Sequence, residues 1–411
     1  MASDLVKRIT SQLKSGLLRA REASTLSEDR LCPLPQLWDL GVRQQLLDLP
    51  LPAPYLTSVA EQVSGAVTTW QNTLDAPNSL VLLGSPVDDT GSVLAAALAQ
   101  SAPEDALEDA LEDAPENSPK ADSWRIFRPL DWTTRPTNPL SIKAQLAKAL
   151  EQLKESEKDD GEDDPDDLAH RFTVILLPPL EQCFLRCIGG WQGVEWLRDT
   201  AGAQRNYFWL ISCNTWAWAF LNRVCQVGAY FDQTADLPQL DRDTLHDWLT
   251  PFAETLALAS DEDSTPLALG DISWSNLVNL AEGSPAVARL LWLRSLRLQK
   301  PDQPDQPAPL EPGYAVPVPL YQVQPSLPSL PDLEALDYYL VHALMLHGVT
   351  SRSQLALSLG EPESLVQVRG QTLRQGGVLR LSPKGLSVEP VHYPRLAAEL
   401  DSNNFLTGDD L

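Results

Sequence analysis

Apolar residues occur along the chain in two patterns, short continuous runs and helical periodicities. Continuous aliphatic and aromatic runs predict buried strands at 80–83, 171–177 and 206–213. Bulky and polar residues alternate at 124–130 and predict a further strand there. Apolar residues at helical spacing predict helices at 55–73 and 139–154. Because strands and helices alternate, we expect an α/β fold with a three-layer parallel sheet.

A glycine loop follows the first of these strands. The strand ends at Gly84, the loop runs to Gly91, and Ser92 precedes the helix-forming run 93–98. A strand, a glycine loop and a helix in this order form the frame of a phosphate-binding P-loop. Gly84, Gly91 and Ser92 are therefore candidate nucleotide-binding residues.

The chemistry of this loop departs from GxxxxGK[ST]. Counting from Gly84 places Asp89, Thr90 and Gly91 at the second Gly, the Lys and the Ser/Thr. With Gly91 as the second Gly, Ser92 stands at the Lys position. Both alignments lack the lysine that contacts the β- and γ-phosphates in a working P-loop. Asp88 and Asp89 also place negative charge where a phosphate would bind.

The strand at 171–177 ends without the acids of a P-loop enzyme, one of which holds Mg²⁺ while another orients water. Pro178 and Pro179 occupy those places and cannot ligate a metal. Glu181 is the nearest carboxylate, and we interpret it mainly as a helix-start residue that matches the helix dipole. We predict no catalytic residue and no metal site.

The net charge of −25 is concentrated in two tracts. Residues 104–120 carry seven acids and one lysine, and residues 151–167 carry ten acids and two lysines. The tracts mark expected disordered insertions at 101–123 and 155–167, whose deletion should leave the core intact. The remaining chain is mildly acidic, so no global basic field for nucleic acid exists.

The cysteines and the termini bear on localisation. No signal peptide or run of 18 apolar residues is visible, which indicates a cytoplasmic protein with reduced thiols. The CxxxC spacing of Cys183 and Cys187 is a poor zinc spacing, so buried structural thiols are expected. Residues 1–21 predict a basic amphipathic helix that packs on the domain; peripheral contact with an anionic membrane or a partner is the alternative.

The chain divides into five expected segments. They are an amphipathic helix and proline-rich arm at 1–54, a degenerate P-loop α/β domain at 55–250, a helical lid at 251–299, a proline-rich linker at 300–332 and a winged-helix-like domain at 333–411.

The C-terminal segment reads as three helices, at 333–347, 353–359 and 363–375, followed by a two-stranded hairpin at 378–388. This order is typical of a winged helix. Its candidate residues for binding DNA or a protein partner are Arg369, Arg374, Arg380 and Lys384. Four cations beside nearby acids are few for a DNA reader, so we favour protein contact and keep DNA as the alternative.

Taken together, residues 80–296 resemble the AAA+/STAND group of P-loop ATPases, with both catalytic motifs altered. The resemblance implies that Asn214 is a polar sensor of the γ-phosphate and that Arg289, after the break at Gly283-Ser284-Pro285, is a second sensor in the lid. A strand-end cap for Asn214 and an ordinary lid cation for Arg289 are the alternatives. The group commonly assembles, so a homo-oligomer is a further expectation.

Three functions remain open from the sequence. The first is a non-hydrolysing, pseudo-ATPase-like regulatory or scaffold protein that acts through protein contacts, since phosphoryl transfer depends on positioned positive charge that is missing here. The second is a conformational switch that binds ATP or ADP weakly. The third is a regulator that reads DNA through the winged helix. No cofactor is predicted with certainty.

Overall fold

The structure, a computed structural model, describes residues 31–408 except 35, 102–123, 129, 131, 133–134, 158–172, 232, 259–272 and 300–319. The chain forms two compact units. One contains residues 53–238 and 329–411, and the other contains residues 1–52 and 239–328. Each unit is described by itself.

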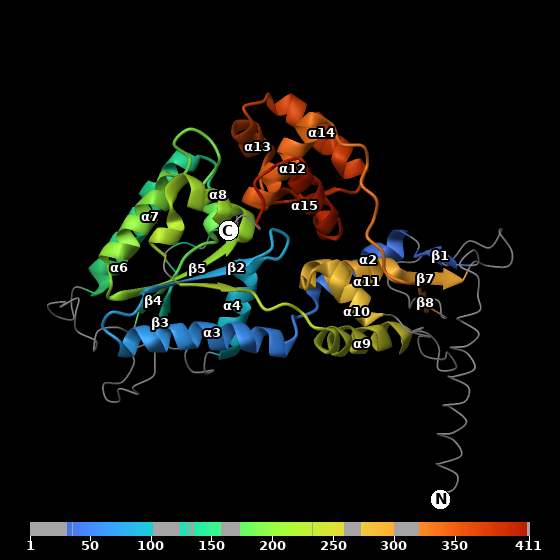
Figure 1. The fold of residues 1–411 in the computed structure, drawn as a ribbon, viewed down its shortest axis with the longest axis horizontal. Helices are drawn as coiled ribbons and strands as arrows, with labels where there is room; N and C mark the ends of the chain where they lie inside the picture. Colours follow the sequence, from blue (N-terminus) through green and yellow to red (C-terminus); the bar gives the residue numbers. More distant parts are fainter. Residues whose placement is uncertain are drawn as a thin grey trace, which may run out of the picture. The chain divides into compact units, whose positions relative to one another are not determined.

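A five-stranded parallel sheet forms the centre of the first unit (Figure 1). Its order is β3-β4-β5-β2-β6, with every neighbouring pair parallel. The strands are β2 (Ser79–Gly84), β3 (Arg125–Phe127), β4 (Thr173–Leu176), β5 (Tyr207–Asn214) and β6 (Thr234–Asp236). The predicted strands are confirmed, with 124–130 shortened to three residues, and β6 was not predicted because its short polar sequence carries no apolar run.

Helices cover both faces of this sheet and complete the three layers (Figure 1). On one face, Trp209 and Ile211 of β5 pack among apolar residues of three helices. On the other face, Phe208 contacts Trp70, with ring centroids 5.5 Å apart. The first face carries α6 (Ile142–Glu157), α7 (Gln192–Ala203) and α8 (Thr215–Cys225), and the second carries α3 (Ala53–Asn72) and α4 (Thr90–Ser101). All eight residues of β5 are buried, as a strand covered on both faces requires.

The C-terminal part of this unit is the predicted winged helix. Its helices are α12 (Ala335–His347), α13 (Arg352–Leu359), α14 (Glu363–Gln375) and α15 (Tyr393–Ser402), and its wing is the antiparallel pair β9 (Leu379–Ser382) and β10 (Gly385–Val388). Thr350 exchanges two backbone hydrogen bonds with Leu386, which ties the wing to the start of α13. Gly385 has φ +139°, and a Cβ there would lie 2.5 Å from the Thr350 carbonyl oxygen, so this turn needs glycine.

The second unit combines helices with a small antiparallel sheet of order β1-β7-β8. It contains β1 (Leu31–Pro33), α2 (Gln36–Asp48), α9 (Arg242–Leu258), α10 (Trp274–Ala281), α11 (Pro285–Ser295), β7 (Leu296–Gln299) and β8 (Leu320–Gln322). Asp241 Oδ1 accepts from the Thr244 N–H at 2.7 Å, which caps α9.

The proline-rich arm expected within segment 1–54 contains a helix that was not expected, α2 (Gln36–Asp48). The chain up to Pro52 belongs to the unit of α9–α11. Trp248 Nε1 donates to the Pro50 carbonyl at 2.8 Å and fixes the end of this segment to α9. The predicted amphipathic helix at 1–21, and almost all of both acidic insertions and of the linker up to 319, lie outside the described residues.

Candidate functional site

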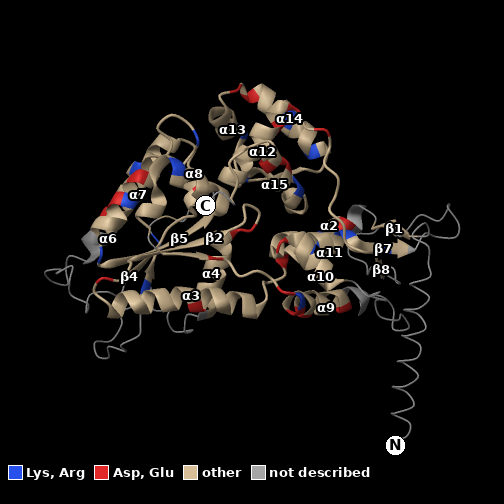
Figure 2. Ribbon diagram, in the orientation of Figure 1, with Lys and Arg blue, Asp and Glu red and all other residues tan. Residues whose placement is uncertain are grey.

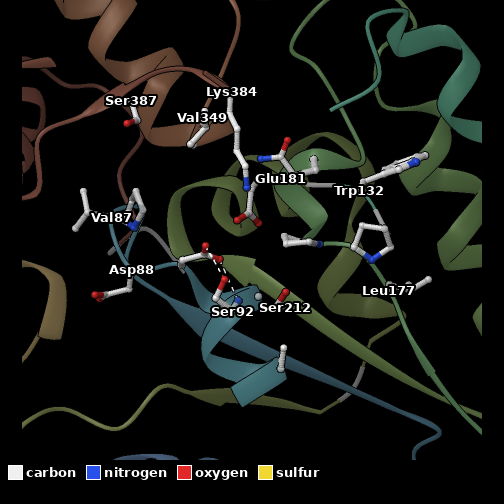
Figure 3. A pocket seen from close by; sticks show the side chains of 18 of the residues that line it. Val87, Asp88, Ser92, Trp132, Leu177, Glu181, Ser212, Val349, Lys384 and Ser387 are labelled. Atoms are coloured by element: carbon white, nitrogen blue, oxygen red, sulfur yellow. Dashed lines mark hydrogen bonds between the residues drawn. The ribbon is translucent and has the colours of Figure 1, made fainter. Parts of the chain in front are cut away.

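The loop between β2 and α4 is capped by its own carboxylate. Asp89 Oδ1 accepts from the Ser92 N–H at 3.0 Å, and Asp89 Oδ2 accepts from the Ser92 hydroxyl at 2.7 Å. Asp89 is therefore the N-cap of α4 (Figure 3). A carboxylate of the chain holds the helix N-terminus, the part of the frame that binds phosphate in a working P-loop.

Two other amides of this loop donate to acceptors within the loop. Asp88 N–H donates to the Ser85 carbonyl at 3.2 Å, and Thr90 N–H donates to the Asp88 carbonyl at 2.9 Å. The Ser85 hydroxyl donates to Asp88 Oδ2 at 2.9 Å, and Pro86 has no N–H to offer. The loop thus satisfies several of its own donors.

Both glycines of the loop serve close packing. A Cβ on Gly84 would lie 2.4 Å from Thr90 Oγ1, and a Cβ on Gly91 would lie 2.7 Å from Pro179 Cγ. Pro179 follows β4 and so fills space directly against the first turn of α4. The Pro178-Pro179 pair therefore replaces metal-binding acids with an apolar wall.

Glu181 lies beyond this wall, in the short 3₁₀ helix η4 (Leu180–Gln182). Its Oε2 accepts from the Asn214 N–H at 3.2 Å. Burial raises the pKa of Glu181 to about 7, and the nearby Asp89 adds to this while the Arg135 guanidinium opposes it. The carboxyl is consequently easy to protonate near neutral pH.

Asn214 ends β5 and caps α8. Its Oδ1 accepts from the Ala217 N–H at 2.7 Å, and its Nδ2 donates to the Leu346 carbonyl of α12 at 3.3 Å. Both ends of the amide are thus occupied by the fold, and the side chain is 2% exposed. This geometry is that of the strand-end cap, the alternative to a phosphate sensor.

Arg289 belongs to α11, in the second compact unit. Its Nη1 donates to the Leu47 carbonyl of α2 at 3.4 Å. The side chain therefore joins two helices of that unit.

A pocket of about 310 Å³ opens at the carboxyl ends of β2, β4 and β5 (Figure 3). One side consists of the glycine loop, the end of β4 and Glu181, and the other side belongs to the winged helix. Among the predicted residues, the pocket brings together Gly91, Ser92, Arg380 and Lys384. Gly84, Asn214, Arg369 and Arg374 do not line it.

The winged-helix cations thus separate into three environments. Arg380 and Lys384 line the pocket, and Figure 3 shows the Lys384 side chain directed toward Glu181. Arg369 forms ion pairs with Glu334 at 2.7 Å and with the fully buried Asp337, whose Oδ1 accepts from Arg369 Nε at 2.9 Å. Arg374 is exposed on α14, does not line the pocket and has no bond to the side chain of another described residue.

A buried arginine holds the winged helix to the α/β domain. Arg135 donates from Nε to the Phe184 carbonyl at 2.6 Å and from Nη2 to the carbonyls of Glu181 and His347, the latter at 3.1 Å. Two of these acceptors belong to the α/β domain and one to the end of α12. Burial lowers the pKa of Arg135 to about 10, which leaves it charged at neutral pH.

A second polar contact joins the same two parts. His342 Nε2 lies 3.0 Å from the Leu406 carbonyl, and Arg186 Nη1 lies 3.2 Å from His342 Nδ1. This arrangement requires a neutral ring with its proton on Nε2, consistent with burial lowering the pKa of His342 to about 4. Arg186 is thereby a docking residue of the winged helix.

Sequence reasoning missed several residues of this region. Arg135 stands in a polar loop whose composition gives no sign of burial, and Arg128, Trp132 and Ser212 line the pocket without belonging to a motif. The sequence also could not show that the side chains of the wing point into this pocket, because that depends on how the wing packs against the sheet. The sequence did indicate two of the pocket residues, Arg380 and Lys384, but as candidates for binding DNA or a protein partner.

The five described cysteines are unpaired thiols, and burial raises the pKa of Cys183, Cys187, Cys213 and Cys225. Cys183, Cys213 and Cys225 are buried as expected, whereas Cys32 and Cys187 are partly exposed. Among the described residues no cluster of three potential metal ligands occurs. No helix in the described part of the chain is long and apolar enough to cross a membrane.

The parallel sheet, the glycine loop at the end of β2 and the appended winged helix decide the fold. It is a P-loop-type α/β fold with a C-terminal winged helix. The sequence matches no protein-family model and no curated protein. Solved structures similar to it include the Aeropyrum pernix ORC1 protein in complex with DNA, at 10% identity and a TM-score of 0.36, covering 86% of this chain and 95% of that one.

Two further structures are similar at the same level. The Walker-type ATPase of Pyrococcus abyssi has 10% identity and a TM-score of 0.34, over 81% of this chain and 94% of that one. The Aeropyrum pernix ORC2 protein, in ADPNP and ADP complexes, has 12% identity and a TM-score of 0.32, over 84% of this chain and 92% of that one. These similarities concern overall fold, so the residue assignments rest on the contacts described above.

Proposed function

We propose that the protein is a non-hydrolysing relative of P-loop ATPases that works as a regulatory or scaffold protein through protein contacts. The observation that carries this proposal is the Asp89 cap on α4. A bound phosphate would have to displace a carboxylate that already holds two hydrogen bonds, and would meet the negative charge of Asp88 and Asp89.

The chemistry of hydrolysis is also unsupported. Phosphoryl transfer needs a cation on the β/γ-phosphates and acids that hold Mg²⁺. Ser92 stands at the lysine position, and Pro178 and Pro179 stand at the acid positions. The side-chain amide of Asn214, the expected sensor, is hydrogen-bonded to backbone groups of α8 and α12.

The outer face of α14 supports a protein partner over DNA. Leu365 and Val368 are 39% and 60% exposed there, and Leu357 on α13 is 52% exposed. This helix also carries one acid, Glu363, in its first turn, and its charges are coloured in Figure 2. Arg369 is held in a buried ion pair, which leaves Arg374 as the exposed cation of α14. Apolar contact area with little positive charge suits a protein surface better than phosphates.

Calorimetric titration with ATP and with ADP, each with and without Mg²⁺, tests the loss of nucleotide binding. We expect no heat and no thermal shift at millimolar nucleotide. Binding tighter than roughly 100 µM, about 5.5 kcal/mol, would contradict the proposal and favour a nucleotide switch. In that case Asp89→Lys, which places a long cation in the phosphate position, should change the affinity, whereas Arg374→Ala should not.

Duplex DNA titrated at several salt concentrations tests the remaining alternative. The proposal predicts no salt-dependent affinity. A steep loss of affinity with salt that Arg374→Ala reduces would instead assign DNA binding to α14. Arg352→Ala, at an exposed position on α13, is the matched charge control.

A further inference from the structure

We propose that the pocket between the glycine loop and the wing binds a small organic anion, whose charged group pairs with Lys384 and Arg380 and whose apolar body lies against the apolar wall of the pocket. This inference goes beyond the proposed function, because it assigns a ligand to the pocket beside a P-loop that lacks its lysine and its metal-binding acids. The pocket volume of about 310 Å³ is within the range of small-molecule sites.

The positive charge of this pocket comes from outside the P-loop. Lys384 and Arg380 enter from the wing, and Arg128 enters from the end of β3. Arg380 Nε donates to the Ser387 hydroxyl at 2.8 Å, which orients the guanidinium along the wing. The missing P-loop lysine is thus offset by cations of another domain, at a different position in the pocket.

Two of the pocket's acids are held on the glycine-loop side by hydrogen bonds. The Asp89 carboxylate accepts from Ser92, and the Asp88 carboxylate accepts from the Ser85 hydroxyl. Glu181 is the carboxyl toward which Lys384 is directed (Figure 3). An anion that takes the place of Glu181 beside Lys384 would leave Glu181 protonated, which its burial already favours.

Several polar and charged groups around Glu181 determine whether its carboxyl is protonated or ionised. Asp89 at the start of α4 raises its pKa, and the Arg135 guanidinium and the Asn214 N–H lower it. Lys384 approaches from the wing. Anion binding should therefore be coupled to proton uptake by Glu181, and the affinity should rise as the pH falls through about 7.

The pocket also has an apolar wall, to which both of its sides contribute. Leu177 and Pro179 lie at the end of β4, and Val349 and the fully buried Met345 belong to the winged helix. Trp132 adds an aromatic face. The wall favours a ligand with an apolar body over a bare inorganic ion, because only such a ligand gains from its burial.

Met345 provides a direct probe of occupancy. The chain contains two methionines, Met1 and Met345, and Met345 is fully buried at the pocket. In full-length protein carrying [methyl-¹³C]methionine, the two methyl signals are separable by Met345→Leu. Phenylacetate and phenyl phosphate are the organic anions to titrate, with benzyl alcohol as the neutral analogue and inorganic phosphate as the bare ion.

We expect both organic anions to shift the Met345 signal saturably, and benzyl alcohol and inorganic phosphate to bind at least about tenfold more weakly. Lys384→Glu should abolish the shift, and Arg374→Ala, outside the pocket, should leave it unchanged. Binding should tighten between pH 8 and pH 6 in the wild type but not in Glu181→Gln. Lys384 and Arg374 are both exposed, so neither variant should impair folding.

Three results would overturn the proposal. They are no movement of Met345 at about 10 mM of either anion, an equal response to benzyl alcohol, and a response that survives Lys384→Glu. A shift caused by ATP as well as by both test anions would contradict the proposed function and would leave the anion pocket standing. The two proposals therefore fail by different observations.

Discussion

Asp89 and Ser92 form a closed pair at the start of α4, with the Asp89 carboxylate accepting from both the backbone N–H and the hydroxyl of Ser92, at 3.0 and 2.7 Å. The pair reproduces with one side chain what a phosphate does for a P-loop: it neutralises the positive end of the helix dipole and satisfies an amide. The fold of the loop therefore does not depend on a ligand.

Removing this cap should cost stability. We expect Asp89→Ala to lower the free energy of unfolding by about 1 kcal/mol, since the Ser92 amide loses its acceptor. Asp89→Asn keeps an acceptor oxygen and should cost less. Urea denaturation of the three proteins measures the difference. Equal stability of Asp89→Ala and the wild type would show that the capping geometry contributes nothing, and would weaken the argument against phosphate.

Replacing Arg135 should detach the winged helix. In Arg135→Met, the carbonyls of Phe184 and Glu181 lose their donor in a buried place, while the His347 carbonyl keeps Gln182 Nε2 as a donor at 3.4 Å. At about 1–3 kcal/mol for each of the two groups, the total should exceed about 2 kcal/mol. Arg135→Lys keeps the charge but not the planar fork, so it should be only partly better. Hydrogen exchange of α12 relative to α6 measures detachment.

Uniform loss of protection in both helices of Arg135→Met would indicate a general folding defect rather than a docking role. Gln354 offers a milder comparison, because its Nε2 donates to the Pro136 carbonyl at 3.0 Å across the same interface. Gln354→Ala should raise exchange in α13 and α12 and leave α6 unchanged.

Arg369 and Arg374 should respond oppositely to truncation although they lie on the same helix. Arg369→Ala leaves the fully buried Asp337 without its partner and should destabilise the protein by about 3 kcal/mol. Arg374→Ala, at an exposed position, should stay within about 0.5 kcal/mol of the wild type. Thermal denaturation compares them. If the two variants had equal stabilities, the ion pair with Asp337 would not be structural.

Glu181 should make stability depend on pH in a defined direction. Its folded pKa, about 7, lies above the ordinary value of 4.5, so the native state binds the proton more tightly than the unfolded state. The stabilisation from the protonated carboxyl is present at low pH and is lost as the pH rises through about 7. Glu181→Gln should therefore match the wild type near pH 5 and exceed it at pH 8.

The measurement is the difference in unfolding free energy between Glu181→Gln and the wild type across that range, because other groups, such as His342, also titrate and cancel in the difference. His342 acts in the reverse direction, since its lowered pKa removes stability as the pH falls from 6.5 toward about 4. A flat difference from pH 5 to pH 8 would mean that the Glu181 carboxyl is not desolvated in solution.

Much of the fold could be read from local patterns. The run Leu80–Leu83 and the strand that ends at Asn214 needed only apolar continuity, and α14 appeared with the bounds that the structure shows, Glu363–Gln375. Helix α2 was not found: five prolines between 33 and 54 suggested an extended arm, yet three of them fall after the helix ends at Asp48.

The sequence by itself determined what the P-loop lacks, because the identity of the residue at each motif position can be read directly. The lysine is absent, prolines stand at 178–179, and acids stand at 88–89. Only the tertiary structure decided where the remaining groups act. In the structure Arg380 and Lys384 line the pocket, and the Asn214 amide bonds to helices α8 and α12. Arg135 is buried between the α/β domain and the winged helix. The physical reason is that side-chain direction and burial depend on packing between segments far apart in the chain, which one-dimensional patterns do not encode.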